Sequence, residues 1–557
     1  MLKKRYPAIV FFSLVVFALA ISVGTSAGSQ SAQRAHIVIL STTDMHGRIF
    51  PVDYYTNKYD NVGIAKVATL VKEARQKDPD LLLVDSGDTI QGTPLEYFHN
   101  KRNNTPPDPM MLTMSALHYD AMTVGNHEYN FGLKVLEKAR SEAKFPWLSA
   151  NTYDTNVKGD PSNHYTPYII KEVNGVRVGV LGLTTPGIPN WENVPNYQGL
   201  EFKETVSEAK KWVPVLRGLG KVDLVVITMH MGIEEDLNTG ALNPSQVPNE
   251  NAAVAIARQV PGVDVILMGH THRDVPSLIV NGVLLSQANR WASHLARVDV
   301  YLEKAAADNR WHVMAKAART IPVTEKTAID PEIAQLGQPY DKETQNWLGK
   351  IIGESPEELT APDCRFRDTA IIDLIHRVQL EAGKADVSMA ACFNPQARIP
   401  KGSVTVRDIA GLYEYENTLV TLELTGQQLK DALEHSARYF REYQTGKSPA
   451  DLVEQRVPGY NFDMAQGVTY ELDLTKPFGQ RIQSLRFKGQ PLSPTQKLRV
   501  VTNNYRVNGG GNFTMYKGVP VVYRSSEEVR ELIIDWVERN KKIPTQADNN
   551  WRIVGAK

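Results

Sequence analysis

The chain has no net charge, few cysteines and only one long hydrophobic run. Lys and Arg together number 62, as do Asp and Glu, so the basic excess that binders of long nucleic acid normally carry is missing. A local group of arginines would still suffice for a small anionic ligand. After the N-terminal run there is no second hydrophobic segment, and no internal repeat or low-complexity tract occurs. We therefore expect a globular protein that does not bind long nucleic acid.

The one hydrophobic run lies at the N-terminus and has the form of an export signal. A basic region at residues 3–5 precedes an apolar run at residues 8–23, and small residues suited to cleavage follow at 25–27. An uncleaved signal anchor is the alternative, although the run is slightly short of a full membrane span. We expect residues 1–27 to be a signal peptide and the mature protein to be periplasmic or secreted. After cleavage we expect no stable membrane association and no obligate protein partner.

The two cysteines, Cys364 and Cys392, would then lie in an oxidising compartment. A disulfide between them is one interpretation, and two buried free thiols are the other. Both stay open, because the sequence does not give the distance between the two residues.

The length of the chain and the order of its elements predict two domains. A chain of 557 residues is too long for one hydrophobic core. From residue 36 to about 323, short apolar runs alternate with helical patterns such as 63–77, 132–144 and 206–216, which favours a layered α/β domain. A charged stretch at 324–359, with a helix start signal at 330–332, is expected to form an interdomain helix. A second domain with strands at 418–424 and 468–474 should then run to the C-terminus.

Five of the apolar runs end in the same way, with a carboxylate, amide or imidazole just past the strand. These runs lie at residues 38–40, 81–84, 121–124, 224–227 and 265–268. Open α/β folds bind their ligands at the carboxyl ends of such strands. One Gly-Asn-His-Glu motif would be weak evidence, but five such ends are hard to obtain by chance. The side chains concerned are Asp44, His46, Asp88, Asn126, His127, His230, His270 and His272.

All of these except His127 suit a site for two cations. The mixture of nitrogen and oxygen ligands fits zinc, manganese or iron and argues against calcium, which prefers oxygen alone. Asp88 is the expected bridging ligand. Two cations roughly 3.5–4 Å apart can clamp a phosphoryl group and lower the pKa of a water molecule. Seven other histidines are expected to be ordinary core or surface imidazoles, namely His99, His118, His164, His294, His312, His376 and His435.

In this order the motifs Asp-x-His, Gly-Asp, Gly-Asn-His-Glu, a lone His and Gly-His-x-His resemble those of the calcineurin-like metallophosphoesterases. The resemblance implies a four-layer αββα sandwich holding two divalent ions of manganese, zinc, cobalt or iron. It places Asp44, His46, Asp88 and His272 on one ion, and Asp88, Asn126, His230 and His270 on the other. It gives the catalytic role to the imidazole of His127, beside Asn126. Many relatives carry an Asp three residues after this histidine, whereas this chain has Asn130, which can hydrogen-bond the ring but cannot stabilise an imidazolium as a carboxylate does.

The C-terminal part is similar to the second domain of the 5′-nucleotidase family over most of residues 364–516. The matching motifs are Cys-Arg-Phe-Arg at 364–367, Arg-Ile-Pro-Lys-Gly at 398–402, Tyr-Glu-Tyr-Glu-Asn-Thr at 413–418, and Asn-Asn-Tyr-Arg-Val-Asn-Gly-Gly-Gly at 503–511. The resemblance implies that Tyr415 and Tyr505 stack on a base. It also implies that Arg365 and Arg398 bind an anion and that Asn394 contacts the substrate. Taken alone, these residues would equally fit two half-buried core tyrosines and surface arginines.

Together the two resemblances cover nearly all of the mature chain. They predict a metallophosphoesterase domain at 33–325, a linker helix at 326–354 and a smaller α/β substrate-binding domain at 355–557. Gly511 stands where many 5′-nucleotidases have an Asp that contacts the sugar or base. That difference, the segments 460–470 and 503–506, and Asn130 favour the branch with 2′,3′-cyclic-nucleotide 2′-phosphodiesterase and 3′-nucleotidase activity.

We therefore expect dimetal-dependent hydrolysis of small nucleotide phosphoesters outside the cytoplasm, on 2′,3′-cyclic nucleotides and 3′-nucleotides. A 5′-nucleotidase or UDP-sugar hydrolase is the alternative among the enzymes. A nucleoside-scavenging binding module without catalysis and a sulfur-oxidation relative with the same fold are the alternatives from other classes.

Overall fold

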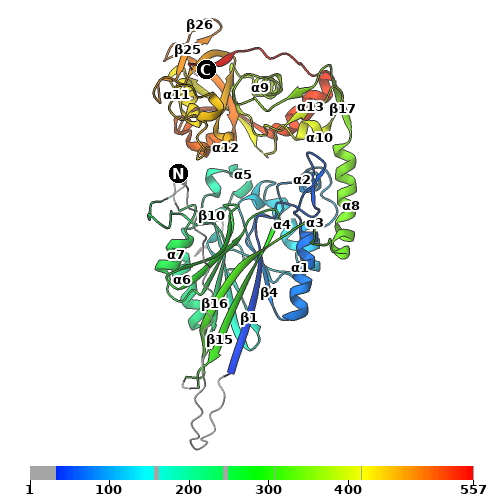
Figure 1. Cartoon of the computed structure of the whole chain (residues 1–557), viewed down its shortest axis with the longest axis vertical. Helices are drawn as coiled ribbons and strands as arrows, with labels where there is room; N and C mark the ends of the chain where they lie inside the picture. Colours follow the sequence, from blue (N-terminus) through cyan, green and yellow to red (C-terminus); the bar gives the residue numbers. More distant parts are fainter. Residues whose placement is uncertain (1–32, 156–161, 243–248, 307, 416, 556–557) are drawn as a thin grey trace, which may run out of the picture.

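The computed structural model describes residues 33–155, 162–242, 249–306, 308–415 and 417–555. Figure 1 shows two lobes joined along one side by the helix α8 (Pro331–Leu348). We call the part before α8 the first lobe and the part after it the second lobe. The predicted signal peptide at 1–27 lies outside the described residues. Within the described part of the chain, none of the helices has both the length and the apolar content that a membrane span requires.

The first lobe contains two six-stranded sheets. One has the order β16-β15-β1-β4-β5-β6 and the other β13-β14-β12-β11-β9-β8. The strands of the first sheet are β1 (Gln33–Thr42), β4 (Leu82–Asp85), β5 (Ala121–Thr123), β6 (Trp147–Leu148), β15 (His294–Lys304) and β16 (Trp311–Pro322). Those of the second are β8 (Tyr168–Val173), β9 (Val176–Thr184), β11 (Leu224–His230), β12 (Val265–Met268), β13 (Asp274–Val280) and β14 (Val283–Ala288).

The two sheets face one another and share a buried apolar layer. That layer takes side chains from both sheets, such as Ile37 and Val84 from one and Val180, Val226 and Leu267 from the other. Helices pack on the outer faces, namely α1 (Ile64–Lys77), α3 (Pro109–Ala116) and α4 (Leu133–Glu142) on one side, and α6 (Thr205–Gly218) and α7 (Ala253–Gln259) on the other. This is the predicted four-layer αββα arrangement.

The strands that carry the predicted ligands run parallel in each sheet. In the first sheet β1 pairs parallel to β4, and β4 to β5; in the second, β11 pairs parallel to β9 and to β12. Their carboxyl ends therefore meet at the same edge of the two sheets. The predicted runs at 81–84, 121–124, 224–227 and 265–268 correspond to these elements within three residues at each end, whereas β1 begins five residues before the run at 38–40.

The linker helix is shorter than predicted. It begins at Pro331, where the Asp330 side chain accepts a hydrogen bond from the backbone N–H of Ile333 at 3.1 Å, and it ends at Leu348. Residues Ile351–Ser355 form the strand β17, which pairs with β21 (Gly402–Thr405) in the second lobe. A glycine directly after the helix and two β-branched isoleucines favour this early end.

The second lobe is built on a five-stranded mixed sheet of order β23-β19-β27-β22-β28 and a four-stranded sheet of order β26-β25-β24-β29. The strands of the larger sheet are β19 (Val387–Ala391), β22 (Thr418–Thr425), β23 (Asp463–Gln466), β27 (Lys497–Asn503) and β28 (Val521–Glu528). The smaller has β24 (Val468–Asp473), β25 (Ile482–Phe487), β26 (Gln490–Pro491) and β29 (Trp551–Val554). The main helices are α9 (Ala370–Gly383), α11 (Gly426–Ser436) and α13 (Val529–Asn540).

A disulfide joins Cys364 to Cys392 in this lobe. Both residues are buried. Of the two interpretations left open by the sequence, the disulfide is therefore confirmed by the bond itself, and the pair of free thiols is wrong.

Candidate metal centre

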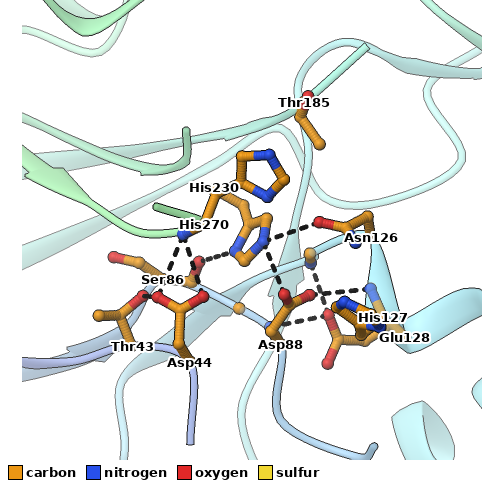
Figure 2. A network of polar contacts seen from close by, with 12 residues as sticks. Thr43, Asp44, Ser86, Asp88, Asn126, His127, Glu128, Thr185, His230 and His270 are labelled. Atoms are coloured by element: carbon orange, nitrogen blue, oxygen red, sulfur yellow. Dashed lines mark hydrogen bonds and ion pairs between the residues drawn. The ribbon is translucent and has the colours of Figure 1, made fainter. Parts of the chain in front are cut away.

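The seven predicted ligands meet at the carboxyl ends of the strands, and Figure 2 shows five of them, namely Asp44, Asp88, Asn126, His230 and His270. They fall into two groups, Asp44 with His46 and His272, and Asp88 with His230 and His270. Within each group the possible ligand atoms lie within 4.8 Å of one another. The seventh, Asn126, places its Oδ1 3.1 Å from Nε2 of His230.

Asp88 is within reach of both groups. Its Oδ2 lies 3.0 Å from Nε2 of His230 and 3.9 Å from Nε2 of His46. In the other group, Nε2 of His272 lies 3.0 Å from Nε2 of His46 and 3.3 Å from Oδ1 of Asp44. The geometry therefore gives Asp88 the central position that a bridging ligand requires.

The backbone of these loops is held in an unfavourable conformation. Five of the seven residues have a positive φ, between 48° and 69°, which L residues other than Asn and Asp adopt rarely; they are Asp44, His46, Asp88, His270 and His272. Such residues persist only where the surrounding structure imposes the conformation, and they cluster at functional sites. Close approach is also required at Gly125, where a Cβ atom would lie 2.3 Å from Oδ1 of Asp88.

The charges of the site match what cations need. Asp44 and Asp88 are fully buried, and within the described ranges their ion pairs are with imidazoles rather than with Lys or Arg. Burial opposes ionisation of Asp88, but the imidazoles of His230 and His127 outweigh it and hold the pKa of Asp88 well below its usual range. A buried ionised carboxylate surrounded by imidazoles is a donor set that fits divalent ions of the zinc, manganese or iron kind.

The two central histidines have opposite pKa shifts. Burial lowers the pKa of His46 to about 3, so its ring is neutral and free to act as a ligand. Burial also disfavours the charged form of His230, but the Asp88 carboxylate outweighs it and raises the pKa of His230 to about 10. In the ion-free protein the His230 imidazolium therefore neutralises Asp88, and binding of a cation would release that proton.

Glu128 holds the two central loops together although it is not a predicted ligand. Its Oε2 accepts hydrogen bonds from the backbone N–H groups of Asp88 at 3.0 Å and Gly125 at 2.6 Å. Its Oε1 accepts from Thr89 at 2.5 Å and Ile90 at 3.4 Å. Burial raises the pKa of this carboxyl group. The sequence motif contained Glu128, but no sequence signal distinguished its role as a brace from that of a ligand.

His127 lies at the edge of the site. Its backbone N–H donates to Oδ1 of Asp88 at 2.8 Å, and its ring meets the ring of His46 edge-on at 5.3 Å. Its Nδ1 is 2.6 Å from Oδ1 of Asn130, so Asn130 does hydrogen-bond the ring as predicted. The amide of Asn130 in turn contacts Glu192, a residue that no sequence motif indicated.

Aromatic side chains gather in the second lobe around the predicted pair. The Tyr415 ring lies 5.3 Å from that of Phe393 and 6.5 Å from that of Tyr460, and Tyr415 is 42% exposed. Burial, with the nearby phenol of Tyr460, raises the pKa of Tyr505 to about 12. Tyr415, Tyr460 and Tyr505 thus form one group, which we call the tyrosine cluster. Tyr460 was not selected from the sequence as a stacking residue.

Arg506 contacts two members of this cluster, Tyr460 and Tyr505. It is fully buried, pairs with both carboxylate oxygens of Asp463 at 2.8 Å, and donates to the backbone carbonyl of Tyr460. Its guanidinium lies 5.3 Å from the ring of Tyr505. Beside it, Gly511 has φ of 73°, and a Cβ there would lie 2.6 Å from Arg506 Nη1, so the position has no room for the Asp of many relatives.

The predicted anion-binding residues make hydrogen bonds and an ion pair within the second lobe. Arg365 donates to the backbone carbonyl of Cys392 at 2.8 Å and 3.2 Å. The side chain of Arg398 is 64% exposed and pairs with Glu358. Asn394 donates to Oε1 of Glu414 at 2.8 Å, directly before Tyr415 in the sequence. Arg365 also donates to the backbone carbonyl of Phe393 at 3.4 Å and packs against Gly459, directly before Tyr460, so Arg365 borders the tyrosine cluster.

Two charged residues lie directly beside the ligand groups. Arg290 Nη1 lies 3.4 Å from Nδ1 of His272, and its guanidinium covers the ring of Trp291 at 4.2 Å. Burial lowers the pKa of Arg290, and the electrostatic interaction with the phenol of Tyr415 counteracts this. Glu250 Oε1 lies 2.9 Å from Nε2 of His270. Arg290 follows β14 by two residues, so the strand-end signal could have identified it, whereas Glu250 lies in a loop without such a signal.

Known proteins share both halves of this architecture. Residues 37–274 match the family described as calcineurin-like phosphoesterase, and residues 350–518 match the 5′-nucleotidase C-terminal domain. A 2′,3′-cyclic-nucleotide 2′-phosphodiesterase/3′-nucleotidase from Haemophilus influenzae is 30% identical, across 96% of this chain and 90% of that protein. The trifunctional nucleotide phosphoesterase YfkN from Bacillus subtilis is also 30% identical, but this chain covers only 41% of its length. A crystal structure assigned as a 5′-nucleotidase from Staphylococcus aureus superposes with a TM-score of 0.81 at 27% identity, across 93% of this chain and 100% of that one.

Proposed function

Because the chain belongs to the family of metal-dependent nucleotide phosphoesterases that joins a calcineurin-like phosphoesterase domain to a 5′-nucleotidase C-terminal domain, we propose that it hydrolyses 2′,3′-cyclic nucleotides and 3′-nucleotides. The observation that carries this proposal is the position of Arg290, which lies 3.4 Å from His272 of the ligand groups and interacts electrostatically with Tyr415 of the tyrosine cluster. A nucleotide has a phosphate and a base that would occupy these two places.

We assign the two cation sites to the side chains that the structure brings together. Asp44, His46 and His272 would hold one ion, His230, His270 and Asn126 the other, and Asp88 would bridge them. When bound, two such ions polarise the phosphoryl oxygens and lower the pKa of a water molecule. The identity of the ions is part of the proposal, with manganese, zinc, cobalt and iron as the candidates.

The residues of the chain supply orientation and proton transfer. Tyr415 and Tyr505, with Tyr460, would hold the base by stacking, at about 1–3 kcal/mol per ring. The Arg290 guanidinium would bind a phosphate oxygen at the edge of the cation sites. His127, next to Asn126, would stabilise the developing charge or give a proton to the leaving oxygen. A cyclic substrate would pass through the site twice, first for ring opening and then for removal of the remaining phosphate.

The lack of a side chain at Gly511 favours this branch over the 5′-nucleotidases. Its left-handed backbone and the close contact of a Cβ with Arg506 leave no side chain to meet the sugar. The 30% identity to the Haemophilus relative supports the same choice, while the likeness to the Staphylococcus aureus structure keeps 5′-nucleotidase activity as the alternative.

We also propose that the enzyme acts outside the cytoplasm and that the lobes move about α8. The export signal read from residues 1–27 supports the first part, and the polar contacts between the lobes support the second. Cell fractionation, and solution scattering with and without nucleotide, test these two points separately.

The decisive experiment compares substrates and one variant. Initial rates with Mn²⁺, Co²⁺ or Zn²⁺ should be highest on 2′,3′-cyclic AMP and 3′-AMP, and lower on 5′-AMP and a UDP-sugar. His127→Ala should lose most turnover while keeping its metal content, because His127 is not a ligand, and His312→Ala, an exposed imidazole, is the control. A preference for 5′-AMP would establish the alternative, and equal rates for wild type and His127→Ala would remove His127 from the mechanism.

A further inference from the structure

The ring of His127 is connected to a buried carboxylate through the amide of Asn130. Nδ1 of His127 is 2.6 Å from Oδ1 of Asn130, and Nδ2 of Asn130 donates to Oε2 of Glu192 at 2.7 Å. Glu192 is only 6% exposed. Its other oxygen, Oε1, accepts from the backbone N–H of Asn193 at 2.7 Å and from Nδ2 of Asn196 at 2.9 Å.

This arrangement determines which end of the Asn130 amide faces the histidine. Burial raises the pKa of Glu192, but the N–H donors of Asn193, Asn196 and Asn130 favour its ionised form. An ionised carboxylate only accepts hydrogen bonds, so the NH₂ group of Asn130 points to Glu192. The carbonyl oxygen of Asn130 then points to His127, where it can only accept, so Nδ1 of His127 must carry a hydrogen. Nε2 is left as the ring nitrogen that can meet the substrate.

We propose that Glu192 is a positioning residue for the reaction, which sets the amide orientation of Asn130 and through it the tautomer and tilt of the His127 ring. Two residues thereby do what a single Asp does in many relatives. The inference deepens the proposed function and rests on it, because it concerns the imidazole to which that function assigns charge stabilisation or proton transfer.

Glu192 lies on a segment that is anchored at both lobes. It falls between η2 (Ile188–Asn190) and α5 (Val194–Tyr197), which Figure 1 shows at the side of the first lobe facing the second. Its neighbour Trp191 covers the ring of His270 at 5.3 Å, and Asn193 Nδ2 donates to Oγ1 of Thr418 at 3.3 Å. These contacts restrain Glu192 without involving Asn130.

The conservative variant Glu192→Gln separates a positioning role from a merely structural one. Asn193 and Asn196 both donate to the Oε1 side, so the glutamine must keep its oxygen there and turn its NH₂ group toward Asn130. The Asn130 amide then has to rotate by half a turn and present its NH₂ group to Nδ1 of His127. That nitrogen can no longer carry a hydrogen, and the ring takes the other tautomer. We expect kcat on 2′,3′-cyclic AMP to fall roughly tenfold or more, with KM within about twofold and unchanged metal content.

A second substitution should restore the orientation. In Asn130→Asp/Glu192→Gln, the new carboxylate accepts both from the glutamine NH₂ group and from Nδ1–H of His127, so kcat should return to within about threefold of wild type. Asn130→Asp alone brings two carboxylates together across the present 2.7 Å contact, where they repel one another. The kcat of this single variant should therefore be as low as that of Glu192→Gln.

The matched control is Glu208→Gln, another buried glutamate of the first lobe. Both of its neutral donors, Tyr153 at 2.6 Å and Trp212 at 3.1 Å, reach the same oxygen, so a glutamine can keep them. We expect its kcat to equal that of wild type. The proposal is overturned if Glu192→Gln is as active as this control, or if the double variant is no better than Glu192→Gln. Wild-type protein without metal-dependent turnover on any of the four substrates would instead refute the proposed function, and with it the role of His127.

Discussion

At the scale of single residues, buried carboxylates that bind no ion hold the site in shape. Glu128 and Glu192 are both buried, and each accepts hydrogen bonds through both of its oxygens. The ligands themselves could be selected from the sequence because each one follows an apolar strand. The supporting residues could not, because Glu192 lies in a loop 62 residues from its partner Asn130, and nothing in the local sequence indicates that distance in space.

Glu128→Gln should destabilise the first lobe and weaken metal retention. Each carboxylate oxygen of Glu128 faces two backbone N–H groups, so whichever way the glutamine turns, its NH₂ group points at two donors. Leaving such groups unpaired costs about 2–4 kcal/mol of unfolding free energy. Chemical denaturation and metal content after dialysis measure the two effects.

Glu208→Gln again serves as the control for this variant, since its donors share one oxygen. If Glu128→Gln unfolded at the same denaturant concentration as Glu208→Gln, the brace that we assign to Glu128 would not exist.

At the scale of elements, the parallel strands explain why the sequence was informative. Apolar runs predicted β1, β4, β5, β11 and β12 together with the ligands at their ends, since the carboxyl ends of parallel strands meet at one edge. The second lobe was harder. Its sheet is mixed, and its tyrosine cluster comes from a loop, the 3-10 helix η5 (Gly459–Asn461) and the short helix α12 (Asn504–Val507). The contacts of Arg398 with Glu358 and of Arg365 with a carbonyl are set by packing over long range.

Helix α4 offers a pH-dependent contact with β7 (Thr152–Asp154). His164 places Nε2 3.0 Å from Glu137 of the helix and Nδ1 2.7 Å from Asp154 of the strand. Burial lowers the pKa of His164, but the two carboxylates outweigh it and raise the pKa above 6.5. A group with a raised pKa stabilises the fold fully below its unfolded value and loses that contribution as the pH rises through its folded value.

His164→Asn should therefore cost about 1 kcal/mol of unfolding free energy below pH 6.5, and less as the pH is raised above it. Denaturant unfolding curves of wild type and variant at pH 5.5, 7 and 9 give the difference in unfolding free energy directly. The pH dependence of ionisable groups that both proteins share cancels in this difference. A difference that grew with pH would mean that His164 is held as a neutral ring.

At the scale of the whole molecule, the two lobes are stabilised by different means. The first holds the candidate cation sites, and the second holds the disulfide between Cys364 and Cys392. An ion present at 100 times its dissociation constant adds about 2.7 kcal/mol of stability. A disulfide that closes a loop of this separation, 28 residues, adds about 3.6 kcal/mol in the chain-entropy treatment.

Chelation and loss of the disulfide should consequently affect different parts of the chain. We expect hydrogen exchange with EDTA to quicken in β4, β11 and β12, and exchange in Cys364→Ser/Cys392→Ser to quicken in α9 and β19. Mass spectrometry of peptides from each lobe measures the exchange rates in both experiments. Equal changes in both lobes after chelation would show that the lobes unfold as one unit and would contradict this assignment.

The cage of side chains around Asp88 also sets when an ion can be captured. Asp44 and His270 are 226 residues apart in the sequence and yet in direct contact, and the intervening loops hold their left-handed backbone only within the finished fold. Asp44 is synthesised long before His270, so the metal site is incomplete in the nascent chain. Loading must follow folding, and the metal supply of whichever compartment the chain folds in then decides which element it carries.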